Sequence, residues 1–141
     1  MGKIKRIILV CSGNVCRSPM AEGILKSELK KRGWDGIGVS SAGISALEGM
    51  PPVEQAVTVC RDEDMDISGH RSRPLKKDMI KRADLILVME KHQREHILNW
   101  VPKAKDKVFL LGGFARGREE MMEIYNPDGP SSIAYIELNL C

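Results

Sequence analysis

The chain is poor in aromatic residues and cysteines, and it has no long apolar run. Aromatic side chains make up 4% of its 141 residues. The arginines are not interleaved with aromatic residues, a pattern that would have favoured nucleic-acid binding. Its four scattered cysteines are too few for a secreted disulfide scaffold, so we expect a cytoplasmic protein. No apolar stretch approaches the roughly 20 residues of a transmembrane helix, which argues against a membrane protein.

The overall composition is that of a single globular domain. Hydrophobic residues make up 43% and charged residues 29% of the chain, which is ordinary for such a domain. We find no internal repeat and no linker, so residues 1–141 are expected to form one domain. The formal net charge of +3 favours anionic substrates.

Residues 10–19 carry the strongest signal, with the sequence VCSGNVCRSP. Five residues separate Cys11 from Arg17, directly after an apolar run at 7–10 that predicts a strand. A strand that passes through a tight loop into a helix N-terminus directs several backbone N–H groups at one point, which favours an anion. Gly13 and Asn14 suit the left-handed backbone that such a loop requires.

The residue types in this loop predict phosphoryl transfer through cysteine. At the base of the loop, Cys11 is expected to be a reactive thiolate, and Arg17 can bind two oxygens of a tetrahedral anion. No cofactor is expected, and no metal, because His92 and His96 share a helical spacing without a third ligand nearby. The expected phosphate-binding residues are Ser12, Gly13, Asn14, Val15, Cys16, Arg17 and Ser18.

Strand and helix patterns alternate along the chain, which predicts an α/β fold. We expect a three-layer, doubly wound domain whose four parallel strands follow the flavodoxin-like order 2-1-3-4, with helices on both faces and the site at the carboxyl ends of the strands. In the first helix, Ser18 is the expected N-cap and Pro19 the first helical residue. Expected strands are 5–10, 37–40, 83–89 and 107–111; expected helices begin near 18, 51, 75, 91 and 131.

Residues 11–19 resemble the phosphate-binding loop of the low-molecular-weight protein tyrosine phosphatase family. The likeness continues at Ser41, in Ser-Ala-Gly, and at His70, in the segment 67–73. It implies that Asn14, Ser41 and His70 form a hydrogen-bond network that supports the loop. It also implies that Ser18 donates a hydrogen bond to the thiolate.

The chain departs from this family at its general acid. The family has an aspartate before a proline near the C-terminus, whereas this chain has Asn126, followed by Asp128 two positions later. An amide cannot transfer the proton at neutral pH, so activity is expected to be impaired unless Asp128 serves as the backup acid. Leu47 and Asp128 also occupy the pocket-wall positions where the family often has aromatic residues.

The predicted function is hydrolysis of a phosphotyrosine protein or a small aryl phosphate through a phosphocysteine, with phosphate and vanadate as inhibitors. Because of Asn126, a non-catalytic phosphate-binding or substrate-trapping protein is the main alternative. Protein-arginine phosphatases of this family have a threonine where this chain has Val15, which favours phosphotyrosine. An arsenate reductase needs further cysteines after the third strand, and residues 90–100 contain none.

Overall fold

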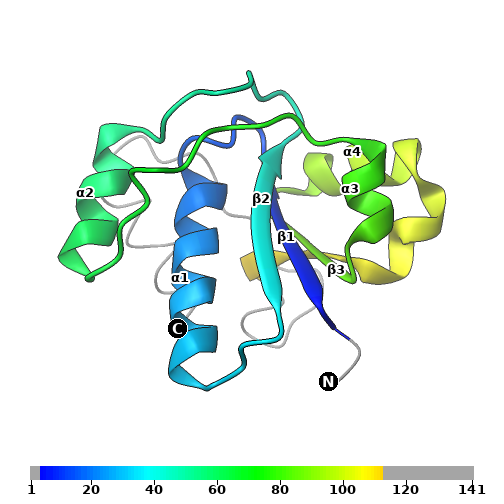
Figure 1. The fold of residues 1–141 in the computed structure, drawn as a ribbon. Coiled ribbons are helices and arrows are strands. Elements are labelled where there is room, and N and C mark those ends of the chain that lie inside the picture. The colour runs from blue at the N-terminus through cyan, green and yellow to red at the C-terminus, as the bar shows by residue number, and fades with distance from the viewer. Residues whose placement is uncertain (1–3, 113–141) are drawn as a thin grey trace.

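The computed structural model describes residues 4–112, and within them the chain forms one parallel sheet (Figure 1). Its strands are β1 (Arg6–Cys11), β2 (Gly38–Gly43), β3 (Leu85–Val88) and β4 (Val108–Leu110). They lie in the order β2-β1-β3-β4, which confirms the predicted 2-1-3-4 topology. The expected last helix, Asn126 and Asp128 lie outside the described residues.

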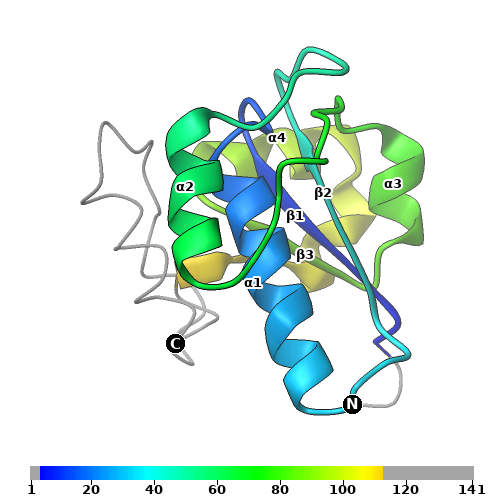
Figure 2. The same cartoon turned by 60° about the vertical axis from the view of Figure 1, so that its left-hand side comes forward.

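Helices cover both faces of the sheet, as Figures 1 and 2 show. On one side lie α1 (Arg17–Lys31) and α2 (Glu54–Asp62); on the other lie α3 (Lys77–Arg82) and α4 (Lys91–Trp100). A 3₁₀ helix, η1 (Pro102–Lys107), joins α4 to β4 and was not predicted. No helix within residues 4–112 has both the length and the hydrophobicity needed to cross a bilayer.

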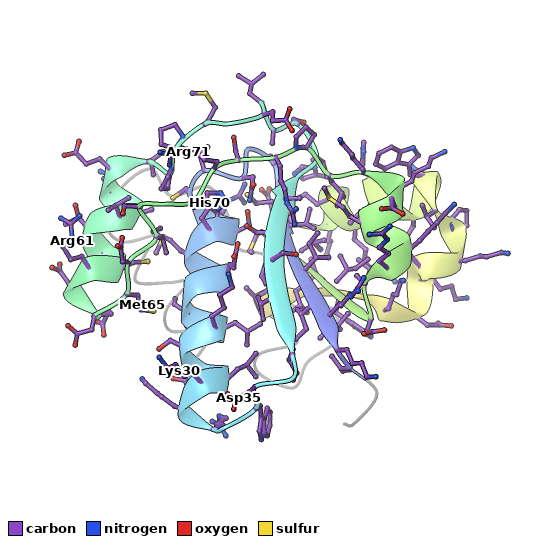
Figure 3. The ribbon with its side chains drawn as sticks, in the orientation of Figure 1. Lys30, Asp35, Arg61, Met65, His70 and Arg71 are labelled. Carbon is purple, nitrogen blue, oxygen red and sulfur yellow. The ribbon has the colours of Figure 1, made fainter. Side chains whose placement is uncertain are left out.

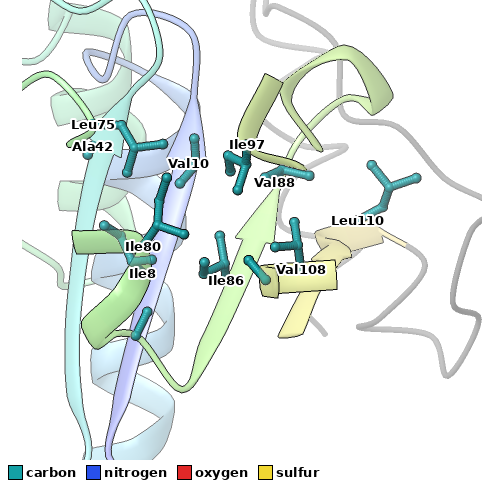
Figure 4. Packing of buried hydrophobic residues seen from close by; sticks show 12 residues of the cluster. Ile8, Val10, Ala42, Leu75, Ile80, Ile86, Val88, Ile97, Val108 and Leu110 are labelled. Atoms are coloured by element: carbon teal, nitrogen blue, oxygen red, sulfur yellow. The ribbon is translucent and has the colours of Figure 1, made fainter. Parts of the chain in front are cut away.

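The sheet is apolar on both faces because its central strands are covered on both sides. Ile7 and Leu9 pack toward α1, whereas Ile8 and Val10 pack into the cluster beneath α3 and α4 (Figure 4). Fully burying one such side chain stabilises the fold by about 1.5–3 kcal/mol. The rigid centre of the sheet therefore fixes the end of β1, where Cys11 lies.

One local prediction was wrong at the start of α1. The helix begins at Arg17 with Cys16 as its N-cap, and no side chain caps it, whereas Ser18 was expected to be the cap. The Ser18 hydroxyl lies 2.9 Å from Cys11 Sγ instead. This serine therefore serves the site rather than the free N–H groups of the helix.

Candidate active site

The loop between β1 and α1 curls tightly and is held from one side by the chain that follows β2. Asn14 has a left-handed backbone with φ 57°. A Cβ atom added to Gly43 would lie 2.5 Å from the Ser12 carbonyl oxygen and 3.0 Å from the Asn14 nitrogen, so only glycine fits this approach. Ile44 N donates to Cys11 O at 3.0 Å and Ser45 N to Ser12 O at 2.9 Å.

Cys11 lies at the base of this loop, and its side chain is directed at hydrogen-bond donors. Its Sγ accepts from Asn14 N at 3.1 Å and lies 2.9 Å from Ser18 Oγ. The residue is 2% exposed. Hydrogen bonds donated to sulfur favour the thiolate form, which is the form that attacks an electrophile.

The buried Asn14 amide favours Ser18 over Cys11 as the donor of the hydrogen bond between them. Asn14 Oδ1 accepts from Arg73 N at 2.9 Å, so its Nδ2 group is the donor to Ser18 Oγ at 2.8 Å and Ser41 Oγ at 3.0 Å. The Ser18 oxygen already accepts that hydrogen bond. Its own proton is therefore available for Cys11 Sγ, which matches the direction that the family resemblance implies.

Two further side chains complete the network behind the loop. Ser41 Oγ donates to Glu22 Oε1 at 2.6 Å, so the chain of hydrogen bonds from Cys11 ends at a carboxylate. His70 Nε2 lies 2.8 Å from Asn14 O, and because a carbonyl oxygen only accepts, Nε2 carries the proton. Figure 3 places His70 on the segment that passes over the N-terminal part of α1. The structure thus brings together Asn14, Ser41 and His70.

Arg17 is held from the opposite side of the loop by the start of α4. Its guanidinium is 1% exposed, and Nη1 lies 2.5 Å from Glu90 Oε2. Glu90 is also the N-cap of α4 in a capping box with Gln93. The carboxylate therefore orients Arg17 and anchors the helix at the same time.

Gln93 is a residue of the site that the sequence analysis missed. Its side chain is fully buried; Oε1 accepts from Met89 N at 2.9 Å and Glu90 N at 3.0 Å, and Nε2 donates to Ser12 Oγ at 3.1 Å. It thereby ties the end of β3 to the phosphate loop. The Glu-x-x-Gln spacing at 90–93 was a readable capping signal, but nothing in the sequence pointed to Ser12.

The second cysteine of the loop differs chemically from the first. Burial raises the pKa of the Cys16 thiol to about 11; the neighbouring Cys11 and Cys60 add to this effect and Arg17 opposes it. Cys16 packs against a small apolar cluster of α1 and α2 that contains Cys60. At neutral pH it is therefore a thiol and not the nucleophile.

Leu47 projects from a loop whose backbone is fixed by Ser72. The Leu47 residue is 71% exposed, whereas Ser72 is 2% exposed. Ser72 Oγ donates to Leu47 O and accepts from Met50 N at 2.9 Å. Backbone bonds from Ser72 N to Met50 O and from Gly49 N to Ser72 O, both 2.8 Å, complete the attachment.

The two histidines of α4 contact different residues. His92 Nε2 lies 3.5 Å from Glu90 Oε1, and the His96 ring packs edge-on against Trp100 with centroids 5.7 Å apart. In the part of the chain that the structure describes, no three His, Cys, Asp or Glu side chains gather as metal ligands.

A cysteine beneath a loop of backbone donors, next to an arginine locked by a carboxylate, defines a cysteine-based phosphate-binding site at the end of a parallel strand. Sequence comparison identifies the family that carries it. Residues 6–137 match the family described as low molecular weight phosphotyrosine protein phosphatase. The chain belongs to this family.

Individual relatives agree with this assignment. A probable low molecular weight protein-tyrosine-phosphatase, EpsP of Ralstonia nicotianae, is 45% identical over 109 residues, covering 77% of this chain and 72% of the relative. The YwlE arginine phosphatase from Geobacillus stearothermophilus is similar in structure, with a TM-score of 0.82, 34% identity and coverage of 96% and 88%. Vibrio vulnificus Wzb in complex with benzylphosphonate has a TM-score of 0.79, 31% identity and coverage of 96% and 90%.

Proposed function

We propose that the chain is a cytoplasmic phosphatase that hydrolyses phosphotyrosine, or a small aryl phosphate, through a phosphocysteine at Cys11. One observation carries the proposal: Cys11 Sγ accepts from Asn14 N and lies 2.9 Å from Ser18 Oγ, at the foot of the loop that Arg17 closes. Such donors favour the thiolate and place it beneath a bound phosphate.

In the first step the Cys11 thiolate attacks phosphorus, so an S–P bond forms as the bond to the aryl oxygen breaks. The backbone N–H groups of the loop and Arg17 bind the three equatorial oxygens, over which the negative charge of the transition state is spread. Glu90 keeps Arg17 in the orientation that two-point binding requires. The leaving aryloxide takes a proton from an acid or from water.

In the second step water attacks phosphorus, the S–P bond breaks, and the Cys11 thiolate returns with release of inorganic phosphate. The water must lose a proton, and an amide at position 126 cannot accept it at neutral pH. We therefore expect slow turnover. Asp128 becomes the acid and base only if the unmodified chain turns over briskly, and Leu47 forms one wall of the substrate pocket.

The choice of phosphotyrosine rests on the relatives and on Val15. The similarity to EpsP, whose name describes a tyrosine phosphatase, and to Wzb bound to benzylphosphonate supports an aryl substrate. The similarity to the YwlE arginine phosphatase makes phosphoarginine the second candidate. Val15 has no hydroxyl with which to bond a guanidino group, so we place phosphoarginine second.

The proposal is tested by phosphate release from a phosphotyrosine peptide, p-nitrophenyl phosphate and a phosphoarginine peptide. We expect release beyond one equivalent per enzyme, slow in absolute terms, inhibited by phosphate and vanadate and abolished in Cys11→Ser. Release of p-nitrophenol that stops at one equivalent per enzyme, without free phosphate, would identify a substrate-trapping protein instead. Faster release from phosphoarginine would assign the second candidate.

A further inference from the structure

A cavity lies away from the phosphate loop, between the first halves of β1 and β2 and the C-terminal end of α3. Its volume is about 330 Å³. Ile8 of β1 lines the cavity, and it belongs to the same apolar cluster as Ile80 of α3 (Figure 4). None of the residues 11–18 lines it.

The cavity is lined by apolar residues and by three arginines from separate parts of the chain. Arg6 comes from β1, Arg82 from the end of α3 and Arg73 from the segment between β2 and α3. The apolar part of its lining includes Ile8, Met79 and Ala83. Three cations around one apolar hollow fit an anion that carries an apolar body.

Existing partners leave this positive charge largely in place. Arg82 Nε lies 3.3 Å from Asp78 Oδ2 in a pair whose side chains are both 66% exposed, so the interaction is weak. Arg73 Nε donates to Ser41 O at 3.0 Å, which uses one of the several N–H donors of a guanidinium. The nearby Asp84 carboxylate binds the backbone N–H groups of Lys5 and Arg6, and it shares its charge between Lys107 and Arg6.

We propose that this cavity binds a small organic anion, a carboxylate or sulfonate attached to an aromatic or aliphatic body. Its volume is at the lower end of the range for small-molecule sites, roughly 300–1,000 Å³, which favours a compact ligand over a peptide segment. The site is separate from the phosphate loop and does not depend on the activity proposed above. Arg73 joins the two, because its backbone N donates to Asn14 Oδ1.

The probe for this site is 2-naphthoate. Its binding is measured by isothermal titration calorimetry with and without saturating vanadate. We expect one binding site whose affinity is the same in both conditions, and binding of acetate at least about tenfold weaker because it lacks the apolar body. Loss of binding in the presence of vanadate would place the probe in the phosphate loop and overturn the proposal. Poly-glutamate should compete only weakly with 2-naphthoate for this site. If it binds there as tightly as 2-naphthoate does, the choice of a small ligand is overturned.

Arg82→Ala tests the residue assignment, because this exposed side chain can be removed without opening the core. We expect its Kd for 2-naphthoate to rise about threefold to tenfold, as for loss of a charge-assisted hydrogen bond. Lys81→Ala is the matched control: it removes the same charge from the neighbouring position, which does not line the cavity. An equal loss in both variants would show general attraction to a basic surface and refute the site. Thermal melts of both variants establish that each is folded.

Discussion

Arg17 and Glu90 are 73 residues apart in the chain, yet their side chains form an ion pair 2.5 Å long behind the phosphate loop. Arg17 is buried, and the Glu90 carboxylate helps to fix the orientation of its guanidinium within the loop. Glu90 also begins α4. The arginine that we expect to bind phosphate is thus positioned from the far side of the sheet.

Glu90→Gln should lower kcat by about tenfold or more while the inhibition constant for phosphate changes little. The amide keeps the shape of the capping residue but removes the carboxylate charge that orients the buried Arg17, so orientation is weakened while attraction for anions remains. Steady-state kinetics with phosphate as inhibitor measure both effects. Glu95→Gln, an exposed position on α4, is the control and should match the unmodified chain. An unchanged kcat in Glu90→Gln would contradict the positioning role.

Ser18→Ala should slow the reaction of Cys11 with iodoacetamide at pH 6. Removing the donor costs the thiolate a hydrogen bond worth about 1.5–3 kcal/mol, which corresponds to roughly a tenfold to hundredfold slower alkylation. In the unmodified chain we expect labelling of Cys11 before the buried Cys60, blocked by vanadate. Ser45→Ala, an exposed position in the next loop, should have no effect. Equal labelling of Cys11 and Cys60 would refute the nucleophile assignment.

Ser72→Ala should raise the KM for a phosphotyrosine peptide by about threefold to tenfold and leave kcat and phosphate inhibition nearly unchanged. The variant loses the hydroxyl that holds both ends of the turn carrying Leu47, and such bonds contribute about 0.5–1.5 kcal/mol each. Inorganic phosphate has no aryl group to contact the expected wall at Leu47, so its inhibition constant should not change. If Ser72 acts through Leu47, the double variant Ser72→Ala/Leu47→Ala should have the same KM as Leu47→Ala alone. Additive increases in KM would mean that Ser72 acts on a residue other than Leu47.

Peroxide should convert Cys11 to a sulfenic acid, which the Cys16 sulfur then attacks with loss of water to form a disulfide. Because the pKa of Cys16 is raised to about 11, its thiolate fraction increases about tenfold for each pH unit between neutrality and that value. Disulfide formation after a peroxide pulse should therefore be faster at pH 9 than at pH 7. Acid quenching and mass spectrometry measure this rate.

Cys16→Ser is the control for the peroxide experiment. Without the second thiol, Cys11 should pass to irreversible higher oxides, so dithiothreitol should restore less activity than in the unmodified chain. Full recovery in Cys16→Ser would show that Cys16 is only a packing residue.

The sequence predicted the fold and the loop well because both depend on local patterns. The apolar runs at β1 and β3 are short-range features, and so is the pattern that predicted a helix from near residue 91, where α4 begins. The error at Ser18 shows where this fails. A serine before a proline is a strong cap signal, but here its hydroxyl has a partner seven residues earlier, in Cys11.

The parts of the site that the sequence did not reveal depend on contacts between distant segments. Gln93 reaches Ser12 across 81 positions, and Ser72 binds a turn 22–25 positions away. Each of these residues has an ordinary local explanation, as a helix cap or a loop serine. Only the packing of β3 and of the 67–73 segment beside the phosphate loop gives them a role.

The general-acid position leads to the last prediction: Asn126→Asp should raise kcat by at least about tenfold with little change in KM. Positioned acid–base groups contribute about 10² to 10⁴ in rate, and a carboxylate at 126 would act in the transition state rather than in substrate binding. The gain should be larger for phenyl phosphate than for p-nitrophenyl phosphate, because phenol, with a pKa near 10 like tyrosine, is the poorer leaving group. Asp128→Asn is the matched variant and should leave the slow turnover of the unmodified chain unchanged. The acid is instead Asp128 if the unmodified chain turns over briskly, Asn126→Asp brings no increase and Asp128→Asn abolishes activity. In that case a carboxylate two positions further along the chain already delivers the proton.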